Sequence, residues 1–187
     1  FEKASVDKFY SHVSRVFNNH GMEKSKNLFE AQLRMYATLY FIIGLIETEL
    51  RKRIMIALSS LAAEKGYREW LDVVPKSFGN LRSVRVAYRN NQYSWDGVEE
   101  FPTFSFWRHL FDGSNFTLLW IPELYTVFPA LEKPKSWKSF AQVGNHMARA
   151  NGIRNMVAHY SFREASDFQR DNEVLIWIIR KMDGVSI

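Results

Sequence analysis

Gly152-Ile153-Arg154-Asn155-Met156-Val157-Ala158-His159-Tyr160-Ser161-Phe162 is the stretch around which the rest of the chain is organised. On a helix, successive side chains turn by about 100° per residue. This places Asn155 and His159, which are four residues apart, together on one side of the helix. Arg154 lies on the flank. The opposite side is an apolar face made of Ile153, Met156, Val157 and Tyr160.

The sequence predicts a helix over about 152–162, with a break or a fresh start at Asn151-Gly152. Arg154 and His159 are five residues apart, so on a regular helix they diverge by about 140°. Three arrangements would bring the two groups together. The Arg side chain wraps round the helix, the helix is distorted locally, or the residues meet those of a second copy.

Arg154 and His159 suit phosphate chemistry. A guanidinium is a permanent planar cation that holds two phosphate oxygens at once. An imidazole has the side-chain pKa nearest neutrality, so it takes up or gives a proton. RNA carries its own nucleophile, the 2′-hydroxyl beside each phosphate. Moving one proton and stabilising charge on phosphorus is therefore enough for cleavage, and no metal or other cofactor is required.

Two short motifs resemble one known family. Arg154-Asn155-Met156-Val157-Ala158-His159 is similar to the Arg-x4-His signature of the HEPN superfamily, in the RNxxAH form of its Abi-like (abortive-infection) members. Glu47-Thr48-Glu49-Leu50-Arg51 is similar to their upstream Glu-x-x-Leu-Arg pattern. The resemblance covers roughly residues 28–179. It implies a helical-bundle ribonuclease, usually a homodimer, in which Arg and His of both subunits line a composite active site.

The periodicity predicts an all-α fold in a single domain over 1–187. The resemblance implies that this fold is a HEPN-type bundle of four to five core helices plus short extra helices. Residues 24–65 contain no Pro and read as one long helix or two collinear ones. The run 39–46 is apolar all round, so we expect it to be buried on several sides. The predicted inner face is Leu28, Leu33, Tyr36, Ala37, Tyr40 and Phe41, continued by Leu50, Ile54, Ala57, Leu58 and Leu61.

Further helices are expected on the same grounds. Ser136 is a predicted N-cap for a helix that runs to Ala150. Arg82, Arg85 and Arg89 form a basic stripe that is either a solvated face or a grip on an RNA backbone. Pro122 separates two short apolar pieces. The remaining predicted helices span about 5–20, 104–111 and, after a linker at 163–167, from 168 or 172 to 182.

Composition limits the classes of function. The chain has 187 residues, of which 47% are hydrophobic, and carries a net charge of +5 that suits a polyanionic partner such as RNA. It has no Cys, which excludes disulfides, thiol nucleophiles and Cys-ligated zinc and is compatible with the cytoplasm. No metal-ligand spacing or phosphate-binding glycine loop is present. The longest apolar run is too short for a membrane.

Glu47, Arg51 and Tyr160 are candidate supporting residues. Glu47 and Arg51 stand at i and i+4, which is typical of an intrahelical ion pair. The alternative is that they orient Arg154 or His159. Asn155 would position substrate. The remaining histidines are interpreted as surface, packing or supporting residues, with His146 the one nearest the motif in sequence.

Three functions remain open. The first is a metal-independent endoribonuclease of an abortive-infection or toxin system. The second is the toxin of a HEPN–nucleotidyltransferase toxin–antitoxin pair, although those toxins carry Tyr two residues after the His, where this chain has Ser161. The third is a catalytically inactive HEPN module that binds RNA or protein. An antitoxin or regulatory protein is an expected further partner of the first two.

Overall fold

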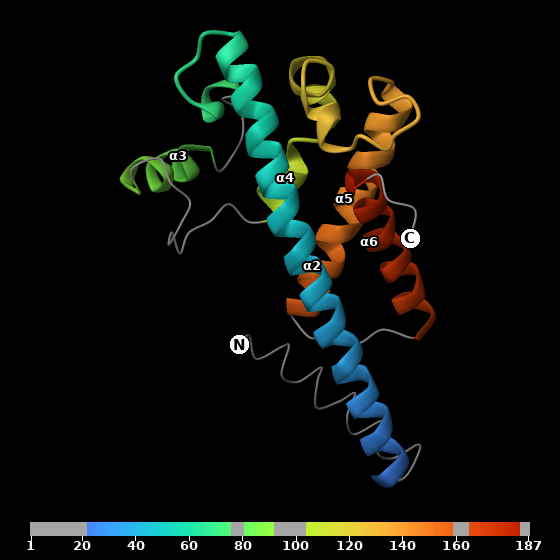
Figure 1. Ribbon diagram of the computed structural model, residues 1–187. Coiled ribbons are helices and arrows are strands. Elements are labelled where there is room, and N and C mark those ends of the chain that lie inside the picture. Colours follow the sequence, from blue (N-terminus) through green and yellow to red (C-terminus); the bar gives the residue numbers. More distant parts are fainter. Residues whose placement is uncertain (1–21, 76–80, 92–103, 159–164, 184–187) are drawn as a thin grey trace.

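The computed structural model describes residues 22–75, 81–91, 104–158 and 165–183. One long helix, α2 (Met22–Glu64, 43 residues), runs the length of the molecule (Figure 1). The shorter elements gather around its C-terminal two thirds, and its N-terminal turns extend beyond them. The described residues contain helices and turns only. The all-α class predicted from the periodicity is therefore confirmed, as is the single long helix over about 24–65.

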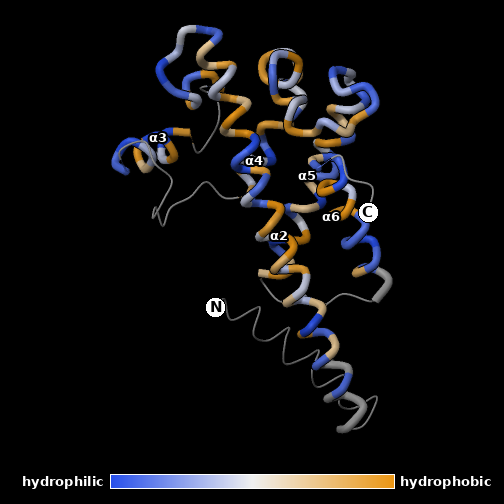
Figure 2. Tube along the Cα trace, in the orientation of Figure 1, coloured by the Kyte–Doolittle hydropathy of each residue, from blue (hydrophilic) through white to orange (hydrophobic). Residues whose placement is uncertain are grey.

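The inner face of α2 was predicted correctly in its C-terminal half and only in part in its N-terminal half, where the side chain of Leu28 lies outside the described residues. Leu50, Ile54, Ala57, Leu58 and Leu61 are buried as expected, and so is Tyr36. Leu33, Ala37, Tyr40 and Phe41 are exposed instead, with Tyr40 at 69% and Phe41 at 66%. The apolar run 39–46 is packed on one side only, through Leu39, Ile43 and Ile46. Figure 2 shows how hydrophobic and hydrophilic segments alternate along this helix.

Helices α5 (Trp137–Ala158) and α6 (Ala165–Asp183) pack on each other and on α2. The Ser136 N-cap is confirmed, since its hydroxyl accepts a hydrogen bond from the Ser139 N–H at 3.1 Å. The expected break at Asn151-Gly152 is wrong, because α5 continues through both residues. A helical Gly costs only about 1 kcal/mol relative to Ala. Burial of the apolar face that follows outweighs that cost.

An aromatic contact and an arginine are among the links between α6 and α2. Tyr36 meets Phe168 edge to face, with ring centroids 5.4 Å apart. Arg53 pairs with Asp183 at 2.9 Å and also donates a hydrogen bond to the Met182 carbonyl. A guanidinium at this position satisfies a carbonyl and a carboxylate where α6 ends, which is favourable at a helix C-terminus. Arg53 therefore joins two elements that are far apart in sequence.

The aromatic residues of the middle of the chain form the core at one end of the bundle. Trp120 is fully buried and donates from Nε1 to the Pro134 carbonyl at 2.8 Å. Its ring lies near Phe111, Phe128 and Phe140. The apolar piece before Pro122 forms a π-helix at Phe116–Trp120. The elements here are α4 (Phe104–His109), η2 (Gly113–Asn115), η3 (Phe116–Trp120) and η4 (Leu124–Val127).

The C-terminal end of α2 is closed by a glycine turn. Gly66 has a φ of +69°, which L-residues rarely adopt. The Gly66 N–H donates to the Ala63 carbonyl and the Tyr67 N–H to the Ala62 carbonyl, the pairing of a Schellman cap. The chain then enters η1 (Trp70–Val73), against which α3 (Leu81–Asn90) packs. Trp70 and Leu71 of η1 are buried.

Candidate active site

Arg154 and Asn155 lie in the last turns of α5, on the side of the helix that faces away from the core. Ile153, Met156 and Val157 are buried at 6% exposure or less, which confirms the predicted apolar face. Arg154 is partly exposed and Asn155 is exposed. The buried face therefore anchors the helix, while a guanidinium and an amide remain accessible beside each other.

The two polar groups are in contact. Arg154 Nη1 lies 3.5 Å from Asn155 Oδ1, a long hydrogen bond between adjacent side chains. The amide oxygen takes up one donor of the guanidinium, which has five. The contact can thus hold the guanidinium of Arg154 toward solvent. The amide nitrogen of Asn155 adds a further hydrogen-bond donor beside it. Both groups suit a phosphate, whose oxygens are acceptors only.

His159 and Tyr160 lie outside the described residues, which on this helix end at Ala158. The structure thus positions the guanidinium of the predicted Arg–His pair and not its imidazole. The sequence-based expectation that His159 shares the Asn155 side of the helix, because the two are four residues apart, falls on residues outside the described part of the chain. Their joint geometry stays a prediction.

Glu47 and Arg51 form the intrahelical ion pair expected at i and i+4, with Arg51 Nη2 3.4 Å from Glu47 Oε1. Both side chains are about one-fifth exposed. They lie at the edge of the buried face of α2, which packs against α5. The predicted intrahelical ion pair is therefore confirmed. A role of the pair in orienting Arg154 or His159 stays a prediction.

His146 sits on α5 against α6, where its ring stacks on Trp177 with centroids 3.8 Å apart. Burial lowers the pKa of His146 below its usual 6.5, and nearby Arg149 lowers it further. A hydrogen bond between its Nδ1 and the Gln142 carbonyl, at 2.8 Å, acts in the opposite direction. These contacts give His146 a packing role. His109 is likewise partly buried and contacts the Ser105 carbonyl through Nδ1.

The three arginines of α3 differ in their contacts. Arg85 pairs with Asp72 at 3.5 Å and donates to the Leu71 carbonyl at 2.8 Å. Arg89 donates to Glu69 Oε1 from Nε at 3.2 Å and from Nη2 at 2.6 Å. Arg82 is exposed. Arg85 and Arg89 thus join α3 to η1 and to Glu69 just before it, so the predicted solvated face is confirmed only in part. The other alternative, a grip on an RNA backbone, stays a prediction.

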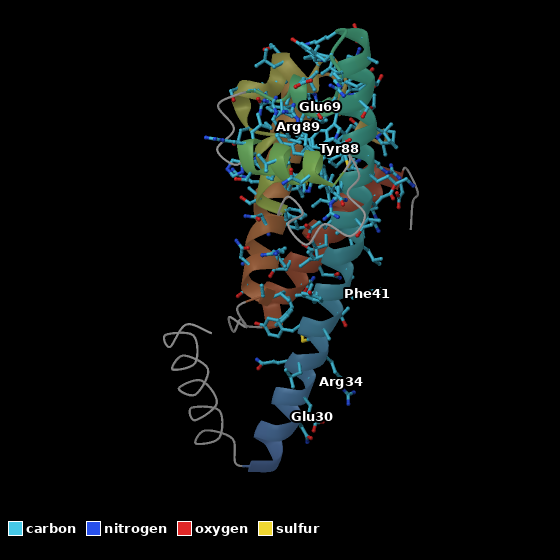
Figure 3. All side chains as sticks on the ribbon, turned by 90° about the vertical axis from the view of Figure 1, so that its left-hand side faces the viewer. Glu30, Arg34, Phe41, Glu69, Tyr88 and Arg89 are labelled. Atoms are coloured by element: carbon cyan, nitrogen blue, oxygen red, sulfur yellow. The ribbon has the colours of Figure 1, made fainter. Side chains whose placement is uncertain are left out.

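No pattern in the sequence predicted a cleft beside the end of α2. A cleft of about 320 Å³ lies beside the end of α2 and contains the buried carboxylate of Glu69. Figure 3 shows Glu69, Tyr88 and Arg89 together near this end of the molecule, far along α2 from Glu30 and Arg34. The arginines at i and i+4 of α3 were visible in the sequence. Their acidic partners, Glu69 and Asp72, are brought to them only by the tertiary fold.

Within the described ranges, no group of three or more His, Asp or Glu side chains is placed to hold a metal ion. Nor does any helix among those residues have the length and hydropathy needed to cross a bilayer. Comparison of the chain with family models, curated proteins and solved structures finds no match. The resemblance to HEPN proteins thus rests on the two motifs at 47–51 and 154–159.

Proposed function

We propose that the protein is a metal-independent endoribonuclease in which Arg154 and His159 form an Arg-x4-His site. The observation that supports this most directly is the exposed Arg154–Asn155 pair on a helix whose other face is buried in the core. An accessible guanidinium fork beside an amide is a phosphate-binding arrangement. The net charge of +5 favours a polyanionic substrate.

In the proposed reaction, His159 takes the proton of a 2′-hydroxyl as that oxygen attacks the neighbouring phosphorus. The bond from phosphorus to the 5′-oxygen breaks, and the leaving oxygen is protonated. Arg154 binds the phosphate and stabilises the negative charge that develops on it. Asn155 hydrogen-bonds the phosphate or steadies Arg154. The products are a 2′,3′-cyclic phosphate and a 5′-hydroxyl end.

The reaction needs a base and an acid, and the proposed site offers one imidazole per chain. We therefore propose a homodimer with a composite cleft, in which His159 of one protomer acts as base and His159 of the partner subunit as acid. Glu47, Arg51 and Tyr160 are proposed as supporting residues. By the family resemblance, cleavage of RNA would halt translation in an infected or stressed cell, and an antitoxin or regulatory protein would restrain it.

The test is cleavage of RNA in the presence of EDTA. We expect the wild-type protein to cut, and His159→Ala to lose at least about a hundredfold in rate, the contribution typical of general acid–base catalysis. His146→Gln is the matched control, since it removes another imidazole that would not touch substrate. Equal activity of His159→Ala and wild type would disprove the proposal. RNA binding without cleavage would favour an inactive binding module.

A further inference from the structure

We infer that the cleft at the end of α2 is a nucleotide-binding site, specific for bases that carry an exocyclic amino group. The cleft is lined by Ser59, Ala62, Ala63, Tyr67, Arg68, Glu69, Trp70 and Tyr88. Its volume of about 320 Å³ is at the lower end for small-molecule sites, which are roughly 300–1,000 Å³. It therefore suits a group the size of one nucleoside. This inference is independent of the proposed cleavage.

Glu69 supplies the polar group that would select the ligand. Its side chain is 6% exposed, and both hydrogen bonds from Arg89 go to Oε1. Its Oε2 is buried and accepts no hydrogen bond from any residue that the structure describes. A buried carboxylate oxygen without a donor is costly. The terminal carboxyl torsion is broad, so a small rotation would present this oxygen to an N–H donor in the cleft.

Two guanidinium groups border Glu69. Arg89 pairs with the carboxylate, so a neutral N–H donor suits Oε2 better than a second cation, and Arg68 brings another guanidinium to the lining. A guanidinium is a planar donor group that suits a phosphate. A neutral N–H donor attached to an anionic group fits both features. A nucleotide has this combination, with an amino-bearing base and a phosphate.

Aromatic side chains complete the site. Trp70 and Tyr88 are buried in its wall and meet edge to face with ring centroids 6.0 Å apart. Tyr67 is 49% exposed and is placed at the cleft by the Gly66 turn. An exposed aromatic ring stacks on any nucleobase, and base stacking on such rings is worth about 1–3 kcal/mol. Stacking would hold the base, and Glu69 would select bases whose edge carries an amino group.

The cleft lies by the C-terminal end of α2, whereas the last turns of α5, which carry Arg154, lie toward the middle of the molecule in Figure 1. The bound nucleotide is therefore either free in solution or one unit of a strand that extends along the protein. Both sources present the same base edge and phosphate. Binding assays with a mononucleotide and with a short RNA of the same base distinguish them.

The decisive variant is Glu69→Gln. Arg89 offers donors only, so the amide oxygen of Gln would stay toward Arg89 and its NH₂ would face the cleft. The acceptor that selects amino groups would then become a donor that selects carbonyl groups. By calorimetry on the full chain, we expect AMP and CMP to bind wild type at least about tenfold more tightly than UMP, a difference of about 1.4 kcal/mol. Glu69→Gln should reverse this order.

Glu64→Gln is the matched control, because it removes the same charge from the exposed end of α2 outside the cleft. We expect it to keep the wild-type preference. Tyr67→Ala should weaken all three nucleotides several-fold without changing their order, and it tests the site if Glu69→Gln does not fold. Tighter binding of AMP than of an oligoadenylate would identify a free nucleotide, and the reverse a strand. No binding to wild type, or an unchanged order in Glu69→Gln, would overturn the inference.

Discussion

At the scale of single residues, Arg154 carries the proposed chemistry through its geometry as well as its charge. A guanidinium holds two phosphate oxygens, whereas an ammonium holds them as a point charge. We expect Arg154→Ala to lower the rate of RNA cleavage by about 10²–10³, as removal of a transition-state donor does elsewhere. Arg154→Lys should recover only part of that loss. Cleavage rates at saturating RNA measure the effect.

Arg149→Ala provides the control for Arg154. Arg149 lies on the same helix and is exposed, so its removal changes the net charge by the same amount without touching the proposed site. We expect its cleavage rate to stay within about twofold of wild type at moderate salt, because five residues of helix turn Arg149 about 140° away from Arg154 and exposed charges are screened by salt. Equal losses in Arg149→Ala and Arg154→Ala would mean that Arg154 contributes only bulk charge.

His146 predicts a pH dependence of stability. Burial lowers its pKa in the folded protein, so below about pH 6.5 the unfolded chain binds a proton that the folded chain does not. The free energy of unfolding therefore decreases as pH falls from about 6.5 toward the folded-state pKa of His146. Above about pH 6.5, His146 is neutral in both states and does not change the stability. The unfolding temperature of wild type should fall more between pH 7.5 and 5.5 than that of His146→Gln. An equal fall in both proteins would contradict the assignment.

At the scale of elements, two glycines of α5 have opposite roles. A Cβ at Gly144 would lie 2.9 Å from the Phe111 carbonyl oxygen, a backbone atom with little room to move. A Cβ at Gly152 would meet nothing within 4 Å. Ala gains about 1 kcal/mol over Gly in a helix, whereas overpacking costs about 1–3 kcal/mol. Ala at Gly144 should therefore lower the stability through this clash, whereas Ala at Gly152 should raise it through its higher helix propensity.

Chemical denaturation of the two variants tests this contrast. We expect Gly144→Ala to lose roughly 1–2 kcal/mol of unfolding free energy and Gly152→Ala to gain up to about 1 kcal/mol. The two substitutions add the same methyl group to the same helix, so each is the control for the other. A gain in Gly144→Ala would show that Gly144 of α5 and the Phe111 carbonyl are not in this close contact. A loss in Gly152→Ala would indicate a real interruption of the helix at that position.

Local signals in the sequence predicted the elements well. The Ser136 cap and the Glu47–Arg51 pair depend on residues three or four apart, and both are confirmed. The break expected at Gly152 is wrong because local preference is worth about 1 kcal/mol, less than the packing of the apolar face beyond it. Periodicity could not show which side of the apolar run 39–46 is covered, and Tyr40 and Phe41 are exposed.

At the scale of the whole molecule, the sequence predicted the fold class and only part of the candidate site. Arg154 and Asn155 lie on the accessible side of α5, as their positions beside an apolar face predicted. The cleft around Glu69 was not predictable, because its acceptor and its arginine partner come from segments twenty residues apart that meet only on folding. The exposure of Tyr40 and Phe41 on α2 likewise depends on where α5 and α6 pack rather than on local sequence.

The central claim is that the nucleophile belongs to the RNA and that no metal takes part. The most direct measurement uses a DNA strand that contains one ribonucleotide, incubated with the wild-type protein in excess EDTA. The proposed mechanism predicts a cut on the 3′ side of the single ribose, which leaves a 2′,3′-cyclic phosphate, and no cut in the matched all-DNA strand. Cleavage of the all-DNA strand, or loss of all cleavage on chelation, would contradict it.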